Sequence, residues 1–411
     1  MKILIVHNAY QQLGGEDTVV AAEAQQLGAS GHTVLRYSRH NDELDGSTLL
    51  RSLKAGCETI WSSRSHHDFE RLLAQEKPGV AHFHNTFPLI SPSAYYACAK
   101  AGVPVVQTLH NYRLLCPSAT FLRDGAVCEL CLGRSMPWPG VLHACYRSSR
   151  AATATVAAML AAHRAMKTWQ TKVDVYIALS EFARRKFVEG GLPPERIVVK
   201  PNFVRTDPGS RCGRGEYALF VGRCSSEKGV NILAEAWAAL SNPISLQIVG
   251  DGPLLKEVET RLHQNACVSV TMPGRLSPGD VSSSMRSARF LVVPSICYEN
   301  FPLVVAEAYA CGVPVIASRL GALAEIVHDG RTGLHFTPGD PIDLAAKAQW
   351  AWDHPEEMKT MGRAARAEYE AKYTAERNCK LLLDIYDGVL AGHQSGRSLS
   401  EPSGVHVRET A

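Results

Sequence analysis

The chain has 411 residues, which at about 100–200 residues per domain predicts two or three domains and excludes a single small module. Apolar residues make up 45% and charged residues 20%, a balance that excludes a fibrous or wholly disordered chain. The 43 basic and 40 acidic residues leave a net charge of +3, and so small an excess does not indicate a nucleic-acid partner.

The first residues predict a buried strand and not an export signal. Met1–Asn8 reaches His7 after only four apolar residues, too few for the apolar part of a signal peptide. The longest apolar run, Ala151–Ala162, stops at His163, short of the roughly 18 residues that indicate a membrane-spanning helix. We therefore expect a cytoplasmic protein, in which the 12 cysteines are thiols or metal ligands rather than disulfides.

Short runs of Ile, Val and Leu alternate with helical stretches along the chain, the pattern of parallel sheets covered by helices on both faces. The strands expected in the first half are Lys2–His7, Thr33–Tyr37, Val80–His84, Val103–Thr108, Val173–Ala178 and Ile197–Lys200. Those expected in the second half are Tyr217–Val221, Ser245–Val249, Val268–Met272, Phe290–Pro294, Val313–Ala317 and Leu334–Phe336. The fold class is therefore α/β, with two doubly wound, Rossmann-like domains facing each other across a cleft, where the carboxyl ends of the strands bind ligands.

Turn-forming residues mark the domain boundary. Pro, Gly, Asn and Asp crowd together over Pro201–Gly215, which predicts a hinge. We expect an N-terminal domain over residues 1–200, with a Cys-rich loop at 116–145, and a C-terminal domain over residues 201–376. A helix is expected at residues 377–391, and the polar, Gly- and Ser-rich segment 392–411 is expected to be a disordered tail.

Two places in the first half carry candidate site residues. Gly14 and Gly15 are adjacent in a loop, where their backbone amides can approach a phosphate or a sugar. His110 follows a buried strand, so it is expected at the cleft, in contact with a sugar hydroxyl or the reacting centre. The alternative is a purely structural role, which applies equally to His82 and His84 on the neighbouring strand.

Four cysteines cluster with the spacing C-x11-C-x2-C-x13-C: Cys116, Cys128, Cys131 and Cys145. This pattern is typical of a closed structural zinc site that holds a long irregular loop. His143 is a substitute for one of the ligands. The alternative is four unligated thiols.

The segment from Leu130 to Val173 has no acidic residue but six basic ones: Arg134, Arg147, Arg150, Arg164, Lys167 and Lys172. A helix predicted at Thr155–Trp169 has the apolar side chains Val156, Met159, Leu160 and Trp169. One hypothesis is that this helix lies on an anionic membrane surface or contacts a phosphorylated lipid acceptor. The alternative is that it packs on its own domain.

In the second half, Arg223 and Lys228 follow a strand end, where two cations suit a diphosphate; the alternative is an exposed pair beside Glu227. Further on, Gly250 and Gly252 lie in Val249–Leu255, which lacks the third glycine of a dinucleotide fingerprint. We expect a glycine turn with close backbone approach there, and a nicotinamide cofactor is disfavoured.

The segment from Pro294 to Gly312 is the most informative. A loop carries Glu299, Pro302 suits the first turn of a helix, and Gly312 ends it. Glu307 is the lone charged residue of that helix. A pair of ribose hydroxyls would satisfy such a carboxylate, and a backbone donor or an arginine would satisfy it equally well.

Together these residues resemble family 4 of the retaining glycosyltransferases, which have the GT-B fold. The resemblance runs from Lys2 to Leu390 through HNAYQQLGGED, LHNYRLLCP, DVYIALSEFARRKF, VVKPNF, FVGRCSSEKG, VGDGPL and YENFPLVVAEAYACGVPVIAS, the last holding the family's E-x7-E as Glu299 and Glu307.

The resemblance implies a role for each candidate. Arg223 and Lys228 match the cations on the donor diphosphate, Glu307 the carboxylate on the ribose, and Glu299 the one near the donor sugar. His110 matches a sugar contact, and Gly14 and Gly15 the loop under the diphosphate. The residues implied to bind the donor also include Gly250, Gly252, Asn300, Phe301, Pro302 and Leu303. Asn300 stands where the family often has glycine, and a C-terminal helix around Asn378–Leu390 crosses back to the N-terminal domain.

The implied reaction is transfer of a sugar from a nucleotide diphosphate to an acceptor hydroxyl with retention, and it needs no divalent metal. The family favours a glycan or lipid-linked acceptor in surface-polysaccharide assembly, at the inner face of the cell membrane. Two alternatives remain: a nucleotide-sugar epimerase of the same fold, and a regulator that binds a nucleotide sugar without turnover.

Overall fold

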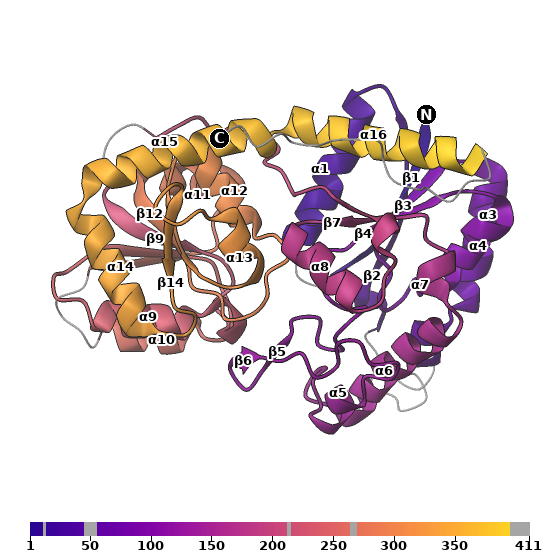
Figure 1. Cartoon of the computed structure of the whole chain (residues 1–411), viewed down its shortest axis with the longest axis horizontal. Coiled ribbons are helices and arrows are strands. Elements are labelled where there is room, and N and C mark those ends of the chain that lie inside the picture. Colours follow the sequence, from indigo (N-terminus) through magenta and orange to yellow (C-terminus); the bar gives the residue numbers. More distant parts are fainter. Residues whose placement is uncertain (11–13, 45–55, 212–214, 264–268, 395–411) are drawn as a thin grey trace.

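The computed structural model describes residues 1–10, 14–44, 56–211, 215–263 and 269–394. Two six-stranded sheets, one from each half of the chain, form the two lobes in Figure 1. Every strand in them pairs parallel to its neighbours. The expected α/β fold with two Rossmann-like domains is therefore confirmed.

The first sheet has the order β2-β1-β3-β4-β7-β8. Its strands are β1 (Lys2–Ala9), β2 (Thr33–His40), β3 (Val80–Asn85), β4 (Val105–Thr108), β7 (Val175–Ala178) and β8 (Ile197–Val199). The helices of this half are α1 (Gly15–Ala29), α3 (Ser63–Glu76), α4 (Ser93–Ala101), α5 (Trp138–Leu142), α6 (Arg150–Ala165), α7 (Thr168–Thr171) and α8 (Glu181–Glu189), with 3-10 turns at η1 (Asn41–Leu44) and η2 (Pro194–Arg196).

The second sheet has the order β11-β10-β9-β12-β13-β14. Its strands are β9 (Tyr217–Val221), β10 (Leu246–Val249), β11 (Val270–Gly274), β12 (Ala288–Val293), β13 (Val315–Ser318) and β14 (Gly333–Phe336). The later helices are η3 (Ser226–Lys228), α9 (Val230–Ala238), α10 (Leu255–His263), α11 (Pro278–Ser287), α12 (Leu303–Ala310), α13 (Gly321–Ile326), α14 (Pro341–Asp353), α15 (Pro355–Lys372) and α16 (Ala375–Gln394).

Burial explains why the strands of the two large sheets could be predicted from the sequence. Ile3, Leu4, Ile5 and Val6 of β1 are all at most 2% exposed, because helices cover both faces of the sheet. A strand in that position is apolar on both faces. The antiparallel hairpin of β5 (Leu122–Arg123) and β6 (Ala126–Val127) was not predicted, since each strand has only two residues and no apolar run.

The helix predicted at Thr155–Trp169 differs from the observed one. Ser149 accepts a hydrogen bond from the Ala152 amide and so caps α6 before Arg150. The helix ends at Ala165, because Lys167 takes a left-handed conformation (φ 52°) and α7 begins after it. Val156, Met159, Leu160 and Trp169 are each at most 3% exposed. These four side chains therefore pack on their own domain and are not available to a membrane.

The last helix, α16, runs along the outside of the N-terminal lobe (Figure 1). Its residues Leu382, Tyr386 and Val389 share one buried cluster with Ile3 and Ile5 of β1. The helix continues to Gln394, so residues 392–394 of the expected tail are helical. Residues 395–411 of that tail lie outside the described residues.

A buried ion pair ties this helix to the rest of the N-terminal lobe. Lys200 and Glu23 have side chains 0% and 1% exposed, and the Lys200 Nζ lies 2.6 Å from a Glu23 oxygen. The same ammonium donates to the Asn378 side chain at 3.2 Å. The end of the first sheet, helix α1 and helix α16 therefore meet at one charged contact.

Candidate functional site

The loops after β9 and β12 are held against each other by backbone contacts. Gly229 has a φ of 69°, and a Cβ there would collide with the Pro294 carbonyl. The Ile296 amide donates to the Glu227 carbonyl at 3.1 Å. The residue after Lys228 therefore has to be glycine for the two loops to approach this closely.

These two loops bring Lys228 and Glu299 together. The Lys228 Nζ lies 2.7 Å from a Glu299 oxygen, with the two side chains 34% and 13% exposed. The Ser295 hydroxyl donates to the same oxygen at 2.7 Å. Burial raises the pKa of Glu299, but Lys228 and Ser295 outweigh it and hold the pKa below its usual value. Glu299 is therefore an anion beside a cation.

The Glu299 loop also reaches the N-terminal domain. The Asn300 side chain is 7% exposed and donates to the Leu109 carbonyl at 3.1 Å, while Ser180 donates to the Asn300 carbonyl at 3.0 Å. The Tyr112 hydroxyl donates to the Glu299 carbonyl at 3.4 Å. Leu109 directly precedes His110, so Asn300 joins the loop of one domain to the strand end of the other.

The next three candidates, Phe301, Pro302 and Leu303, have different surroundings. Phe301 is 7% exposed and packs in the core beside Tyr373, so a ligand can meet only its backbone. Pro302 caps α12, and Leu303 is its first residue. These two residues place the free amides of the helix start, with its positive dipole end, next to Glu299 and Asn300.

Glu307 lies on α12 and is half-buried. Its carboxylate has no hydrogen-bond or ion-pair partner among the described residues, so neither the backbone donor nor the arginine considered above is present. Burial raises its pKa to about 6. A half-buried carboxylate without a protein partner is suited to accept hydrogen bonds from a ligand.

Arg223 follows β9 and is exposed, and its guanidinium makes no hydrogen bond or ion pair with another side chain in the described part of the chain. Gly250 and Gly252 have φ values of 138° and 153°. A Cβ at either would collide with a carbonyl, that of Gly222 or that of Cys224. The expected close approach of this turn is therefore confirmed, and it supports the loop that carries Arg223.

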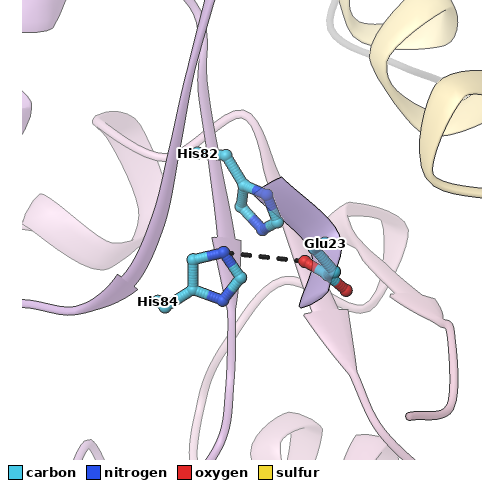
Figure 2. Close-up of side chains that lie close together, drawn as sticks. All are labelled: Glu23, His82 and His84. Atoms are coloured by element: carbon cyan, nitrogen blue, oxygen red, sulfur yellow. Dashed lines mark ion pairs between the residues drawn. The ribbon is translucent and has the colours of Figure 1, made fainter. Parts of the chain in front are cut away.

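His110 is half-buried and stands with the buried His7 and His84 at the carboxyl ends of β1, β3 and β4. Burial lowers the pKa of His84 well below its usual value and that of His110 to about 3, so both are neutral. The His84 Nε2 faces a Glu23 oxygen at 3.6 Å (Figure 2). The His84 Nδ1 lies 2.9 Å from the His110 Nε2.

The position of Glu23 determines where the protons sit. A carboxylate next to Nε2 of a neutral His84 favours the proton on that nitrogen, so Nδ1 is an acceptor. His110 then donates from its Nε2 and keeps a lone pair on its Nδ1. The Nδ1 of His110 can then accept a hydrogen bond from a hydroxyl.

Glu23, His82 and His84 have ligand atoms within 4.8 Å of one another, but they do not form a metal site. The two ring nitrogens of His82 are already hydrogen-bonded, to Tyr386 at 2.7 Å and to Thr108 at 2.8 Å. The Lys200 ammonium occupies one Glu23 oxygen, and its positive charge would repel a metal ion. His82 thus has the purely structural role that was considered for it from the sequence.

Sequence reasoning missed several polar residues that lie near Gly14 and Gly15. Gly14 caps α1, and the next acidic residue, Glu16, accepts from the Tyr10 hydroxyl at 3.1 Å. Burial raises the pKa of Glu16 to about 8. Arg113, with its guanidinium 4.6 Å from the Phe87 ring centroid, lines a pocket beside His110 and Asn111. Glu16 directly follows the two glycines, so its position could have been noticed in the sequence. Its closeness to Arg113 depends on tertiary contacts, which the sequence does not show.

Known proteins resemble the chain in both halves. The family described as Glycosyl transferases group 1 matches residues 211–368, and Glycosyltransferase Family 4 matches residues 13–208. An uncharacterized glycosyltransferase of Methanocaldococcus jannaschii is 33% identical over 53% of this chain and 60% of its own length. A D-rhamnosyltransferase of Pseudomonas aeruginosa is 31% identical over 39% of this chain and 42% of its own length. The chain thus spans less than two thirds of these two relatives.

Longer matches have lower identity. Glycogen synthase of Mycobacterium tuberculosis is 26% identical over 94% of both chains. Among solved structures, HepE of Anabaena in complex with UDP has a TM-score of 0.64 at 17% identity, covering 94% of this chain and 100% of that one. Sucrose-phosphate synthase of Thermosynechococcus elongatus has a TM-score of 0.69 at 18% identity, covering 95% and 99%. Since the two family matches together span nearly all of residues 13–368, the chain belongs to glycosyltransferase family 4 and has the GT-B fold.

Proposed function

We propose that this protein is a retaining glycosyltransferase that moves a sugar from a nucleotide diphosphate to an acceptor hydroxyl. One observation carries the proposal: the Lys228–Glu299 pair stands next to a loop that Asn300 joins to the strand end of His110. In this proposal Lys228 of the C-terminal domain is the cation for a diphosphate, and His110 of the N-terminal domain is the acceptor for a sugar hydroxyl. The UDP and UDP-glucose complexes of HepE, which has the same fold, support a nucleotide-sugar donor.

Each residue has a part in this proposal. Lys228 and Arg223 bind the diphosphate, together with the amides of Gly14, Gly15 and the start of α12. Glu307 accepts hydrogen bonds from the ribose. Glu299 fixes Lys228 and lies near the donor sugar, and His110 accepts from a sugar hydroxyl.

The reaction is a front-side substitution. The bond from the anomeric carbon to the diphosphate oxygen breaks, and the electron pair leaves with the diphosphate, whose charge Lys228 and Arg223 stabilise. The acceptor oxygen bonds to the same face of the carbon, and its proton passes to the departing oxygen. Because two side-chain cations and helix amides take up the charge, the step needs no divalent metal.

The test is incubation of the full chain with a panel of nucleotide sugars, with and without a membrane lipid extract, following release of nucleoside diphosphate. Acceptor-dependent release, and a product whose NMR coupling shows the anomeric configuration of the donor, is the expected result. An altered nucleotide sugar formed without an acceptor would instead identify an epimerase. Tight binding with no turnover would identify a regulator.

Donor binding is expected to weaken in acid through Glu307. Its pKa of about 6 in the free protein means that the hydrogen-bond-accepting anion predominates above that pH and is lost below it. The affinity for a nucleotide sugar, whose two phosphates do not titrate in this range, should therefore rise from pH 5 to pH 7 and then level off. In Glu307→Gln the affinity should be at least about tenfold weaker, since hydrogen bonds to a charged group contribute about 1.5–3 kcal/mol.

Calorimetric titration across this pH range measures the effect. Replacement of the exposed Glu259, on α10, by glutamine is the matched control and should leave the curve unchanged. A Glu307→Gln variant that keeps the wild-type pH dependence would remove Glu307 from the ribose site.

We further propose that the acceptor is lipid-linked and that the Cys-rich side of the N-terminal lobe faces an anionic membrane. No helix among the described residues is both long and apolar enough to cross a bilayer. The exposed large side chains Leu130, Met136, Trp138, Leu142 and Met166 occur instead in the segment that lacks acidic residues, together with the exposed cations Arg134 and Lys167. Apolar side chains among cations favour the surface of an anionic bilayer.

Vesicle sedimentation tests this surface. Trp138→Ala with Lys167→Glu should weaken binding to phosphatidylglycerol vesicles at least about tenfold, because each cation near such a surface contributes about 1 kcal/mol. Ile342→Ala, which removes another exposed apolar side chain (65% exposed), is the control. Arg164 is unsuitable for charge reversal because its guanidinium donates to backbone carbonyls, including that of Leu114 at 2.8 Å. Unchanged binding of the double variant would contradict the proposal.

A further inference from the structure

Four cysteines of the segment that connects β4 to α6 meet at one cavity. Cys116, Cys128, Cys131 and Cys145 line this cavity together with His143. All four are free thiols. Cys116 and Cys131 are each 7% exposed, and Cys128 and Cys145 are half-buried. The tertiary structure therefore gathers the four thiols that the spacing singled out.

The segment around the cavity has little regular structure to hold it. Between Thr108 and Arg150 it contains only a hairpin with two residues per strand and the five-residue helix α5. Several non-glycine residues in it have positive φ values: Ala119 (69°), Phe121 (51°), Asp124 (51°), Ala144 (50°), Arg147 (54°) and Ser148 (51°). Such conformations are unfavourable for L-residues and persist only where other contacts impose them. A cross-link at the centre would supply that constraint.

Polar groups lie next to two of the four sulfurs. The Ser118 hydroxyl lies 3.1 Å from the Cys116 sulfur, and the Cys131 thiol donates to the Pro137 carbonyl at 3.8 Å. A Cβ on Gly140 would come within 2.9 Å of the Pro117 ring and 3.5 Å of the Cys131 sulfur, so glycine lets the backbone pass close to that sulfur. A hydroxyl donor such as that of Ser118 stabilises the charge on a metal-bound thiolate.

We propose that Cys116, Cys128, Cys131 and Cys145 bind one structural zinc ion. Four thiolates in tetrahedral arrangement are a preferred donor set of zinc. Among the described residues no three of these sulfurs lie within 4.8 Å of one another, so side-chain rotations must bring each sulfur to about 2.3 Å from the ion. His143 lies at the same cavity and is the one alternative fourth ligand.

The ion would fix a wall of the cleft. Glu129, next to Cys128, pairs with Lys186 of α8 at 2.7 Å, and the ring of Phe121 lies 5.9 Å from that of Tyr298 in the other domain. The Cys-rich segment thus contacts the residue before Glu299, as does Phe182 of α8, whose ring lies 4.7 Å from that of Tyr298. The argument for the zinc site rests on the four cysteines and does not depend on the proposed function.

Metal analysis of the full chain, purified under reducing conditions without chelator, tests the site. The expected result is about one zinc per chain, and X-ray absorption should show four sulfur neighbours. Replacing zinc by cobalt should give the strong visible bands and the thiolate charge-transfer band of a tetrahedral sulfur site. Three sulfurs and one nitrogen would assign the fourth position to His143 and correct the ligand set.

Variants locate the ion. Cys128→Ser and Cys131→Ser should each lower the zinc content at least tenfold and lower Tm, whereas Cys57→Ser, which removes an exposed thiol elsewhere, should keep both. If the ligand variants do not fold, release of zinc from the wild-type protein by a thiol-blocking reagent, in step with loss of four thiols, gives the same answer. Less than 0.1 zinc per chain in the wild type after growth with added zinc, or two disulfides among the four cysteines, would overturn the proposal.

Discussion

Replacing Lys228 by alanine is expected to lower kcat by about 10²–10³-fold, the usual effect of removing one donor that stabilises charge in the transition state. Lys228 is the cation that contacts Glu299 directly, at 2.7 Å. Its removal takes away charge stabilisation at the departing diphosphate and leaves the Glu299 anion next to it. The loss should therefore appear in kcat as well as in donor affinity.

Steady-state release of nucleoside diphosphate, at saturating donor, measures this loss. Lys256→Ala removes an exposed lysine from α10 of the same domain and serves as the matched control. Equal kcat values for the two variants would show that departure of the diphosphate does not depend on Lys228. The assignment of Lys228 to the site would then fail.

Replacing Lys200 by alanine is expected to destabilise the protein by about 3–5 kcal/mol, because it leaves a buried carboxylate without its partner. Lys200 and Glu23 are 0% and 1% exposed, so water cannot replace the lost ammonium. At about 2–4 °C per kcal/mol for domains of this size, Tm should fall by roughly 6–20 °C. Scanning calorimetry measures the change.

The exposed pair Lys380–Asp384 is the control for this prediction. Its atoms are 2.7 Å apart, but its side chains are 76% and 57% exposed, so Lys380→Ala should cost less than about 1 kcal/mol. Adding Glu23→Gln to Lys200→Ala should restore part of the stability, since the buried charge is then gone. A Tm for Lys200→Ala like that of the Lys380→Ala control would show that water or a shifted chain compensates the charge.

The fold was predictable because its strands are buried on both faces. A run such as Ile3–Val6 has no polar residue and therefore needs no knowledge of its neighbours to be recognised. The β5–β6 hairpin and the end of α6 at Ala165 lack such a signal, since two-residue strands and a left-handed Lys167 are products of the surrounding loop.

The candidate site was only partly predictable. Motifs placed Arg223, Lys228 and Glu299 in one domain, but the sequence does not show that Asn300 turns its side chain to Leu109 or that Phe301 packs in the core. The same holds for Glu16, whose raised pKa depends on burial beside Tyr10. Tertiary contacts decide these features, and the one between Asn300 and Leu109 joins residues 191 positions apart.

The chain passes between the two lobes twice, and the two passages lie side by side. It leaves the N-terminal lobe after Lys200 and returns before α16, where Val204 donates to the Tyr373 carbonyl at 3.0 Å and Asn378 donates to the Pro201 carbonyl at 2.8 Å. Two adjacent connections, bonded to each other, resist sliding and twisting but still permit rotation about one line. We therefore expect a single opening motion, in which the hydrogen bond from Asn300 to Leu109 breaks as Lys228 and His110 move apart. Donor release and exposure of the acceptor site would then be one event and not two.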